Sequence, residues 1–131
     1  MPEAGRTVLA FDFGLKRIGV AVGETELRMA HPLPGIAAPG FGAIEKLVKE
    51  WRPSALVVGL PVAARGEHPL AKRVQRFARQ LEGRFHLPVE RVDERYTSVA
   101  AESLLRGAKK KAVDSVAAQL ILEQYFHGRA A

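Results

Sequence analysis

The chain has 131 residues, with 20 Lys and Arg against 14 Asp and Glu, a formal net charge of +6 and no cysteine. A hydrophobic fraction of 47% with 26% charged residues is ordinary for a globular protein and excludes a disordered or fibrous chain. The absence of cysteine excludes disulfides, thiolate zinc sites and cysteine nucleophiles. We expect a single domain over residues 1–131, whose positive charge favours contact with a polyanion.

No segment of the sequence predicts a membrane span. The longest nearly apolar stretch, Ala55 to Ala64, is interrupted by Pro61 and is shorter than the roughly 20 residues that cross a bilayer. The first residues, MPEAGRTV, lack the apolar run of a signal peptide. We therefore expect a cytoplasmic protein without membrane contact.

The first third of the chain predicts an antiparallel meander. Thr7 to Phe13 and Ile18 to Val22 are rich in β-branched and aromatic residues and flank the short GLKR segment, so they predict a hairpin. Leu27 to Ile36 contains Pro32 and Pro34, which suit a strand at the edge of a sheet because proline cannot donate a ladder hydrogen bond.

A helix and a buried strand are predicted next. After a predicted loop at Pro39 to Gly42, apolar residues recur at helical spacing up to Trp51, and Pro53 ends the helix. Ala55 to Leu60 is a continuous apolar run, which is typical of a strand buried on both faces. We expect this strand at the centre of the sheet.

The following segment predicts a basic helix and a less buried strand. From about Leu70 to Phe85, apolar residues repeat at helical spacing. The remaining faces of this helix carry four cations, Lys72, Arg73, Arg76 and Arg79. Pro88 to Asp93 alternates apolar and polar residues, as a partly exposed strand does.

Two further helices are predicted at the end of the chain. Thr97 or Ser98 can cap a helix that runs to about Arg106. A basic loop then precedes a final helix, whose apolar positions repeat from Val113 to Tyr125. The order β-β-β-α-β-α-β-α-α predicts an α/β fold with a mixed five-stranded sheet. Three antiparallel strands come first, and two strands that follow crossover helices are parallel.

Three acidic positions fall where such elements can converge. Asp12 lies at the end of the first strand, Asp93 or Glu94 lies where the last strand ends, and Asp114 lies in the first turn of the final helix. Each has an ordinary structural alternative: a turn cap at Asp12, a surface ion pair in the segment DER, and a favourable helix dipole at Asp114. Converging carboxylates repel one another unless cations intervene. The group therefore indicates a site for Mg²⁺ or Mn²⁺, with two ions proposed, that acts on a phosphodiester.

Basic residues flank these acidic positions. Lys16 and Arg17 follow the turn at Gly14, and the run Lys109, Lys110 and Lys111 precedes the final helix. Such side chains can bind phosphate oxygens, so we predict that they contact nucleic acid near the acidic site. The four histidines have no metal-ligand spacing and are not assigned to the site.

The sequence resembles the YqgF/RuvX family. Members of this family are described as pre-16S ribosomal RNA nucleases and are related to the Holliday-junction resolvases. The resemblance covers nearly the whole chain and rests on DFGLKRIGVAV, VVGLP, VDERYTSVAAE and KKKAVDSVAAQLIL, in this order. It implies a ribonuclease-H-like fold and a metal-dependent endonuclease. By motif matching it implies catalytic, metal-binding carboxylates at Asp12, Glu94 and Asp114, with Asp93 as the alternative to Glu94.

Several functional alternatives stay open at the level of sequence. A ribosomal RNA precursor, a four-way DNA junction and other structured nucleic acids present the same phosphates, so each is compatible as the substrate. A nucleic-acid-binding or ribosome-associated factor that cuts nothing is compatible with the same fold. The hairpin also resembles that of actin-like ATPases, which need two such lobes. The segment VAARGEHP after VVGLP departs from the family pattern, which leaves substrate contacts there open. Monomer and homodimer are both compatible with the sequence.

Overall fold

The computed structural model describes residues 6–61, 69–93 and 113–129, the last range without the side chains of residues 113, 114 and 129. Five strands form one sheet in the order β3-β2-β1-β4-β5. The elements in chain order are β1 (Thr7–Asp12), β2 (Arg17–Glu24), β3 (Met29–Ala37), α1 (Phe41–Trp51), β4 (Ala55–Leu60), α2 (Ala71–Phe85), β5 (Val89–Asp93) and α4 (Val113–Arg129).

The pairing of the strands confirms the predicted mixed sheet. The first three strands pair antiparallel, β1 with β2 and β2 with β3, while β4 is parallel to both β1 and β5. The proline-containing strand β3 lies at one edge, as predicted, and β5 lies at the other. None of the helices that the structure describes is long and apolar enough to cross a membrane.

The structure corrects two local predictions. The centre of the sheet is β1, with β4 beside it. A continuous apolar run indicates that both faces of a strand are covered. Because helices cover both faces of β2, β1 and β4, such a run does not identify which of these strands is the central one. The predicted loop at Pro39 to Gly42 is also shorter, because α1 begins at Phe41 after Gly40 adopts a φ of 69°. The predicted helix from Thr97 to Arg106 lies outside the described residues.

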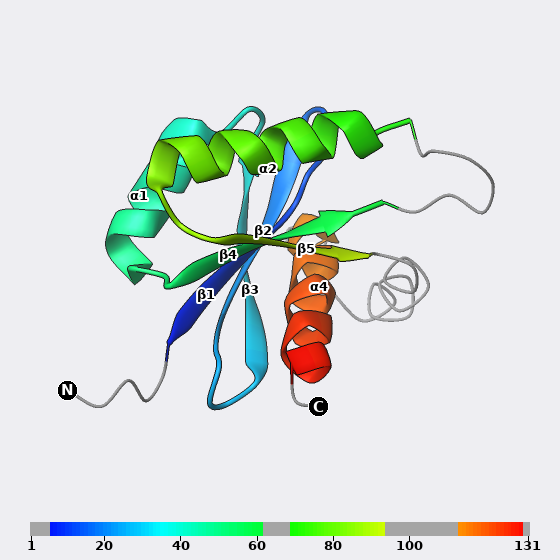
Figure 1. Ribbon diagram of the computed structural model, residues 1–131. Coiled ribbons are helices and arrows are strands. Elements are labelled where there is room, and N and C mark those ends of the chain that lie inside the picture. The colour runs from blue at the N-terminus through cyan, green and yellow to red at the C-terminus, as the bar shows by residue number, and fades with distance from the viewer. Residues whose placement is uncertain (1–5, 62–68, 94–112, 130–131) are drawn as a thin grey trace.

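Alternation along β1 produces two hydrophobic cores, one on each face of the sheet. Helices α1 and α2 lie along one face and α4 lies along the other (Figure 1). Leu9 and Phe11 pack with α1 and α2 on one face. Val8 and Ala10 pack with α4 on the other face. The molecule is therefore a three-layer arrangement in which the sheet lies between the α1 and α2 pair and α4.

Small side chains let α4 approach the sheet closely. Ala10, Ala21 and Ala30 are buried beneath it. At Gly23 a Cβ atom would lie 2.4 Å from the backbone oxygen of Met29 and 2.8 Å from Cε2 of Phe126, closer than real Cβ contacts. Glycine at this position is thus required by both the neighbouring strand and the helix.

A buried hydroxyl fixes the start of α4 on the sheet. Ser115 has 0% of its surface exposed, and its Oγ accepts a hydrogen bond from the amide of Val20 at 3.2 Å and donates one to the carbonyl of Leu33. Val20 and Leu33 face each other across β2 and β3, beside a bulge between Ile18 and Val20. The hydroxyl therefore links two backbone groups that face each other beside the bulge.

We predict that Ser115→Ala lowers the free energy of unfolding by about 2 kcal/mol, because it removes the partner of a buried amide and of a buried carbonyl. Denaturant unfolding monitored by circular dichroism measures the loss. Ser54→Ala is the matched control, since the Ser54 hydroxyl also donates to a backbone carbonyl, that of Thr7 at 3.3 Å, but at an exposed position. Equal stability of the two variants would show that the buried bridge does not hold α4.

Candidate active site at the carboxyl edge of the sheet

The three parallel strands end together at one edge of the sheet. Phe11 of β1 is level with Val58 of β4, which is level with Arg91 of β5. The strands end one or two residues later, at Asp12, Leu60 and Asp93. In open α/β sheets this carboxyl edge is where ligands bind.

Asp12 is held at this edge by the strand ladder and by the aromatic residue that follows it. It is half-buried and pairs with Gly19 of β2. Because Val8 and Ala10 pack against α4, the alternation of the strand places Asp12 on the α4 face as well. Phe13 turns to the opposite face, where its ring centroid lies 5.0 Å from that of Phe77 in α2. The aromatic contact and the ladder with β2 together fix the position of Asp12.

The start of α4 lies at the same end of the molecule as Asp12. Ser115 binds the amide of Val20, the residue after Gly19, while Phe126 packs near Gly23 further along β2. The helix thus runs in the direction of β2, and its first turn is level with the end of β1. Asp114 is the second residue of α4, and its carboxylate lies outside the described part of the chain.

The two candidate acids at the end of β5 differ in what the structure describes: Asp93 is the last residue of the strand, and Glu94 follows it. Arg91 contacts α2 through Gln75 and Glu82, whereas Val92 packs against the α4 core. Alternation therefore places Asp93, which is exposed, on the α2 face and opposite to Asp12. Glu94 lies outside the described residues.

A side chain of α4 also reaches the end of β5. Nε2 of Gln124 donates a hydrogen bond of 2.9 Å to the backbone oxygen of Asp93. The same helix that carries Asp114 is therefore bonded at its start to β2 and β3 and, further along, to the last residue of β5.

The predicted phosphate-binding residues are described only in part. Lys16 and Arg17 are exposed where the turn after β1 enters β2, separated from Asp12 and Phe13 by Gly14 and Leu15. The turn is tight, because a Cβ atom at Gly14 would lie 2.4 Å from the backbone oxygen of Arg17. These two cations thus lie at the carboxyl edge, as predicted. Lys109, Lys110 and Lys111 lie outside the described residues.

The described residues alone contain no group of three or more acidic, histidine or cysteine side chains that could hold a metal ion. Of the three predicted carboxylates, only that of Asp12 belongs to the described part of the chain. Its oxygen atoms are the donors that Mg²⁺ and Mn²⁺ prefer, and it faces the side on which α4 begins. The metal site and its remaining ligands stay a prediction.

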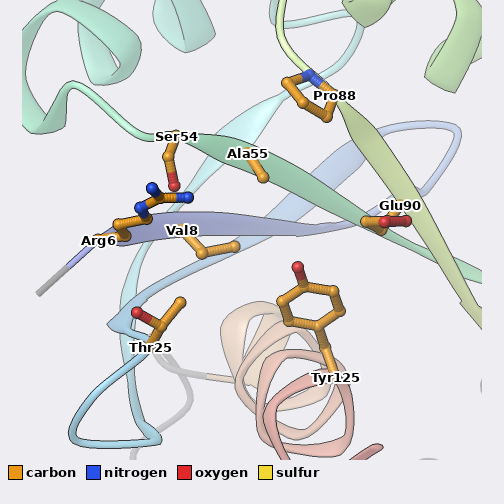
Figure 2. Close-up of a pocket in the computed structure, with 8 residues that line it drawn as sticks. All are labelled: Arg6, Val8, Thr25, Ser54, Ala55, Pro88, Glu90 and Tyr125. Atoms are coloured by element: carbon orange, nitrogen blue, oxygen red, sulfur yellow. The ribbon is translucent and has the colours of Figure 1, made fainter. Parts of the chain in front are cut away.

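A pocket of about 400 Å³ lies at the opposite end of the sheet (Figure 2). It is formed where β1, β4 and β5 begin, and Arg6, Ser54 and Glu90 contribute polar groups. Tyr125 approaches it from α4. None of the predicted site residues lines this pocket, so it is separate from the carboxyl edge.

Sequence analysis missed two residues that position the site. Ser115 was overlooked because its partners, Val20 and Leu33, are 95 and 82 residues away in the chain. Its place beside Asp114 in the motif KKKAVDSVAAQLIL was the available indication. Phe77 falls among the apolar positions of the predicted helix from Leu70 to Phe85, but its contact with Phe13 depends on how α2 crosses the sheet and has no local signal.

Comparison with known proteins places the chain in a family. The model of the RuvX family, described as a Holliday junction resolvase, matches residues 6–128. A protein of Nitrosomonas europaea is 53% identical, with 92% of this chain and 88% of the relative covered. One of Methylobacillus flagellatus is 51% identical, with 99% of both covered. Both relatives bear the name "Putative pre-16S rRNA nuclease".

Solved structures show the same fold at low sequence identity. RuvC of T. thermophilus, in complex with a Holliday junction substrate, superposes with a TM-score of 0.57 at 16% identity, covering 96% of each chain. The Fowlpox virus resolvase, in complex with Holliday junction DNA, has a TM-score of 0.57 at 8% identity, covering 95% of this chain and 99% of the other. The fold is therefore that of the ribonuclease-H-like resolvases, and the chain belongs to the RuvX family of Holliday-junction-resolvase-like nucleases.

Proposed function

We propose that this protein is a metal-dependent endonuclease that hydrolyses phosphodiester bonds in structured RNA, in the processing of the pre-16S ribosomal RNA precursor. One observation carries the proposal: Asp12 lies at the common carboxyl edge of β1, β4 and β5, on the face where α4 begins with Asp114 in its first turn. Relatives at 53% and 51% identity are named as nucleases of this RNA, which supports the choice of substrate.

In the proposed mechanism Asp12, Glu94 and Asp114 hold Mg²⁺ or Mn²⁺. When bound, such ions supply the positive charge that stabilises the attacking and leaving oxygens of a phosphoryl displacement. The chain contributes a fixed geometry: the ladder to Gly19 and the contact of Phe13 with Phe77 hold Asp12, and Ser115 holds the helix that carries Asp114.

Glu94 is a better candidate than Asp93 for the middle ligand. The pleat of β5 directs Asp93 to the face that α2 covers, whereas Asp12 and α4 share the other face. A ligand set needs its carboxylates on one side of the sheet. We therefore propose Glu94, and not Asp93, as the middle metal ligand.

Nucleic acid is the proposed partner, and the basic turn supports this proposal. Lys16 and Arg17 are exposed beside Asp12, where they can bind the phosphates that flank the bond to be cut. We assign Lys109, Lys110 and Lys111 the same role.

We propose a cytoplasmic, single-domain protein that acts as a monomer or homodimer.

A Holliday-junction resolvase is the second candidate, because the fold matches resolvases whose structures contain junction DNA. At 16% and 8% identity this likeness concerns the fold alone. Cleavage assays that offer precursor RNA and a four-way DNA junction side by side separate the two candidates. Faster cleavage of the junction would replace RNA processing as the function.

Asp12→Asn keeps the shape of the side chain and removes one negative charge, so we predict that cleavage in Mg²⁺ or Mn²⁺ falls by orders of magnitude. Binding of nucleic acid in EDTA should be retained or become tighter, since a charge that repels phosphate is lost. Single-turnover cleavage and fluorescence anisotropy measure the two effects. Glu90→Gln, at the opposite end of the sheet, is the control. A folded Asp12→Asn protein that cuts at the native rate in saturating metal would refute the assignment.

The pair Glu94→Gln and Asp93→Asn tests which acid binds the metal. We predict that Glu94→Gln abolishes metal-dependent cleavage, while Asp93→Asn stays within a few fold of the native rate, because its pleat position lies on the other face. Metal titration followed by isothermal calorimetry should show weaker Mn²⁺ binding only for the Glu94 variant. The reverse result would transfer the ligand to Asp93.

A further inference from the structure

The outer face of α2 carries a basic stripe that the proposed active site does not use. At about 100° per residue, Lys72, Arg76 and Arg79 fall within about 60° of one another around the helix, and Arg73 lies beside them. All four side chains are exposed. The buried residues, Val74, Phe77, Ala78 and Leu81, lie on the opposite side. The stripe, defined as Lys72, Arg73, Arg76 and Arg79, therefore faces solvent.

The charge of the stripe is not neutralised within the part of the chain that the structure describes. None of its four members forms an ion pair there. Glu82 is the one acidic residue of α2, and its carboxylate binds Arg91 through two contacts of 3.2 and 3.4 Å. Arg84, the fifth cation of the helix, lies over the ring of Phe41, 4.1 Å from its centroid. Glu82 and Arg84 thus contact other parts of the fold, and the four stripe residues are the charged groups of α2 that can bind a ligand.

The stripe lies close to the carboxyl edge of the sheet. The first residues of α2 lie on the side where β4 ends (Figure 1). Phe77, on the inner side of α2, packs against Phe13, the residue that follows Asp12. A helix with its side chains is about 10 to 12 Å across, so the sheet and about one helix diameter separate the stripe from the α4 face, to which Asp12 points.

We propose that the basic stripe binds the phosphate backbone of a double-stranded arm of the substrate, beyond the bond that is cut. Lys72 and Arg79 are separated by about 10 Å along the helix axis, a length over which a duplex carries about six phosphates. Single strands are bound through exposed aromatic rings on which bases stack, and the stripe consists of cations alone. This chemistry favours a duplex over an unpaired strand. The inference rests on the proposed function, because it takes nucleic acid as the substrate.

The test compares two variants that each lose two positive charges. Arg76→Ala/Arg79→Ala removes half of the stripe. Lys46→Ala/Lys49→Ala is the matched control, because both lysines are exposed on α1, which ends where β4 begins at the opposite edge. All four positions are on the surface, so we expect unchanged melting temperatures. Binding is measured by anisotropy in EDTA over a range of salt concentrations, with a hairpin RNA that has a long duplex arm.

We expect the α2 variant to bind at least tenfold more weakly at low salt and its salt slope to fall by about two, at roughly 0.9 per lost phosphate contact in duplex DNA. The control should change neither value by comparable amounts. KM for cleavage should rise without a matching fall in kcat, because these side chains do not touch the reacting phosphate. Shortening the duplex arm should abolish the difference between variant and native protein.

Equal effects of the two variants would show that only net charge matters, and would overturn the proposal. An equal loss on a single-stranded RNA of the same length would overturn the duplex assignment. The proposed function can fail independently of this inference. If the native protein binds the hairpin through the α2 stripe but cuts neither RNA nor junction DNA in Mg²⁺ or Mn²⁺, the stripe proposal stands and the nuclease proposal is refuted.

Discussion

The pleat of β1 is the constraint on which the rest of the molecule depends. Successive residues of this central strand point to opposite faces, so Leu9 and Phe11 form one core with α1 and α2, and Val8 and Ala10 form the other with α4. The same alternation directs Asp12 to the α4 face at the end of the strand. A shift of one residue in the register of β1 would exchange the two cores and remove the carboxylate from the proposed site.

The position of α4 depends on contacts that are distant in sequence. Gly23 and the small residues around it allow the helix to lie close to β2, and Ser115 bonds its first turn to β2 and β3. Gln124 bonds it to the end of β5. The helix therefore joins the antiparallel and parallel halves of the sheet.

Much of the fold could be predicted because its signals are local. The hairpin around Gly14, the edge strand with Pro32 and Pro34, and the amphipathic helix that contains Phe77 all follow from turn residues, proline and periodicity. The order of the inner strands could not be predicted in this way. The apolar run at Ala55 to Leu60 showed correctly that both faces of β4 are covered, but such a run contains no information about which strand is central.

The sequence by itself determined the family, the mixed sheet and the candidate acids Asp12, Glu94 with Asp93 as its alternative, and Asp114, because motif order, periodicity and charge are properties of the linear chain. The tertiary structure decided which face each strand end presents, which separates Asp93 from Asp12. It also decided that the hydroxyl of Ser115 lies between Val20 and Leu33. Faces and buried partners depend on strand register and on the packing of residues far apart in the chain, and neither is a property of any local segment.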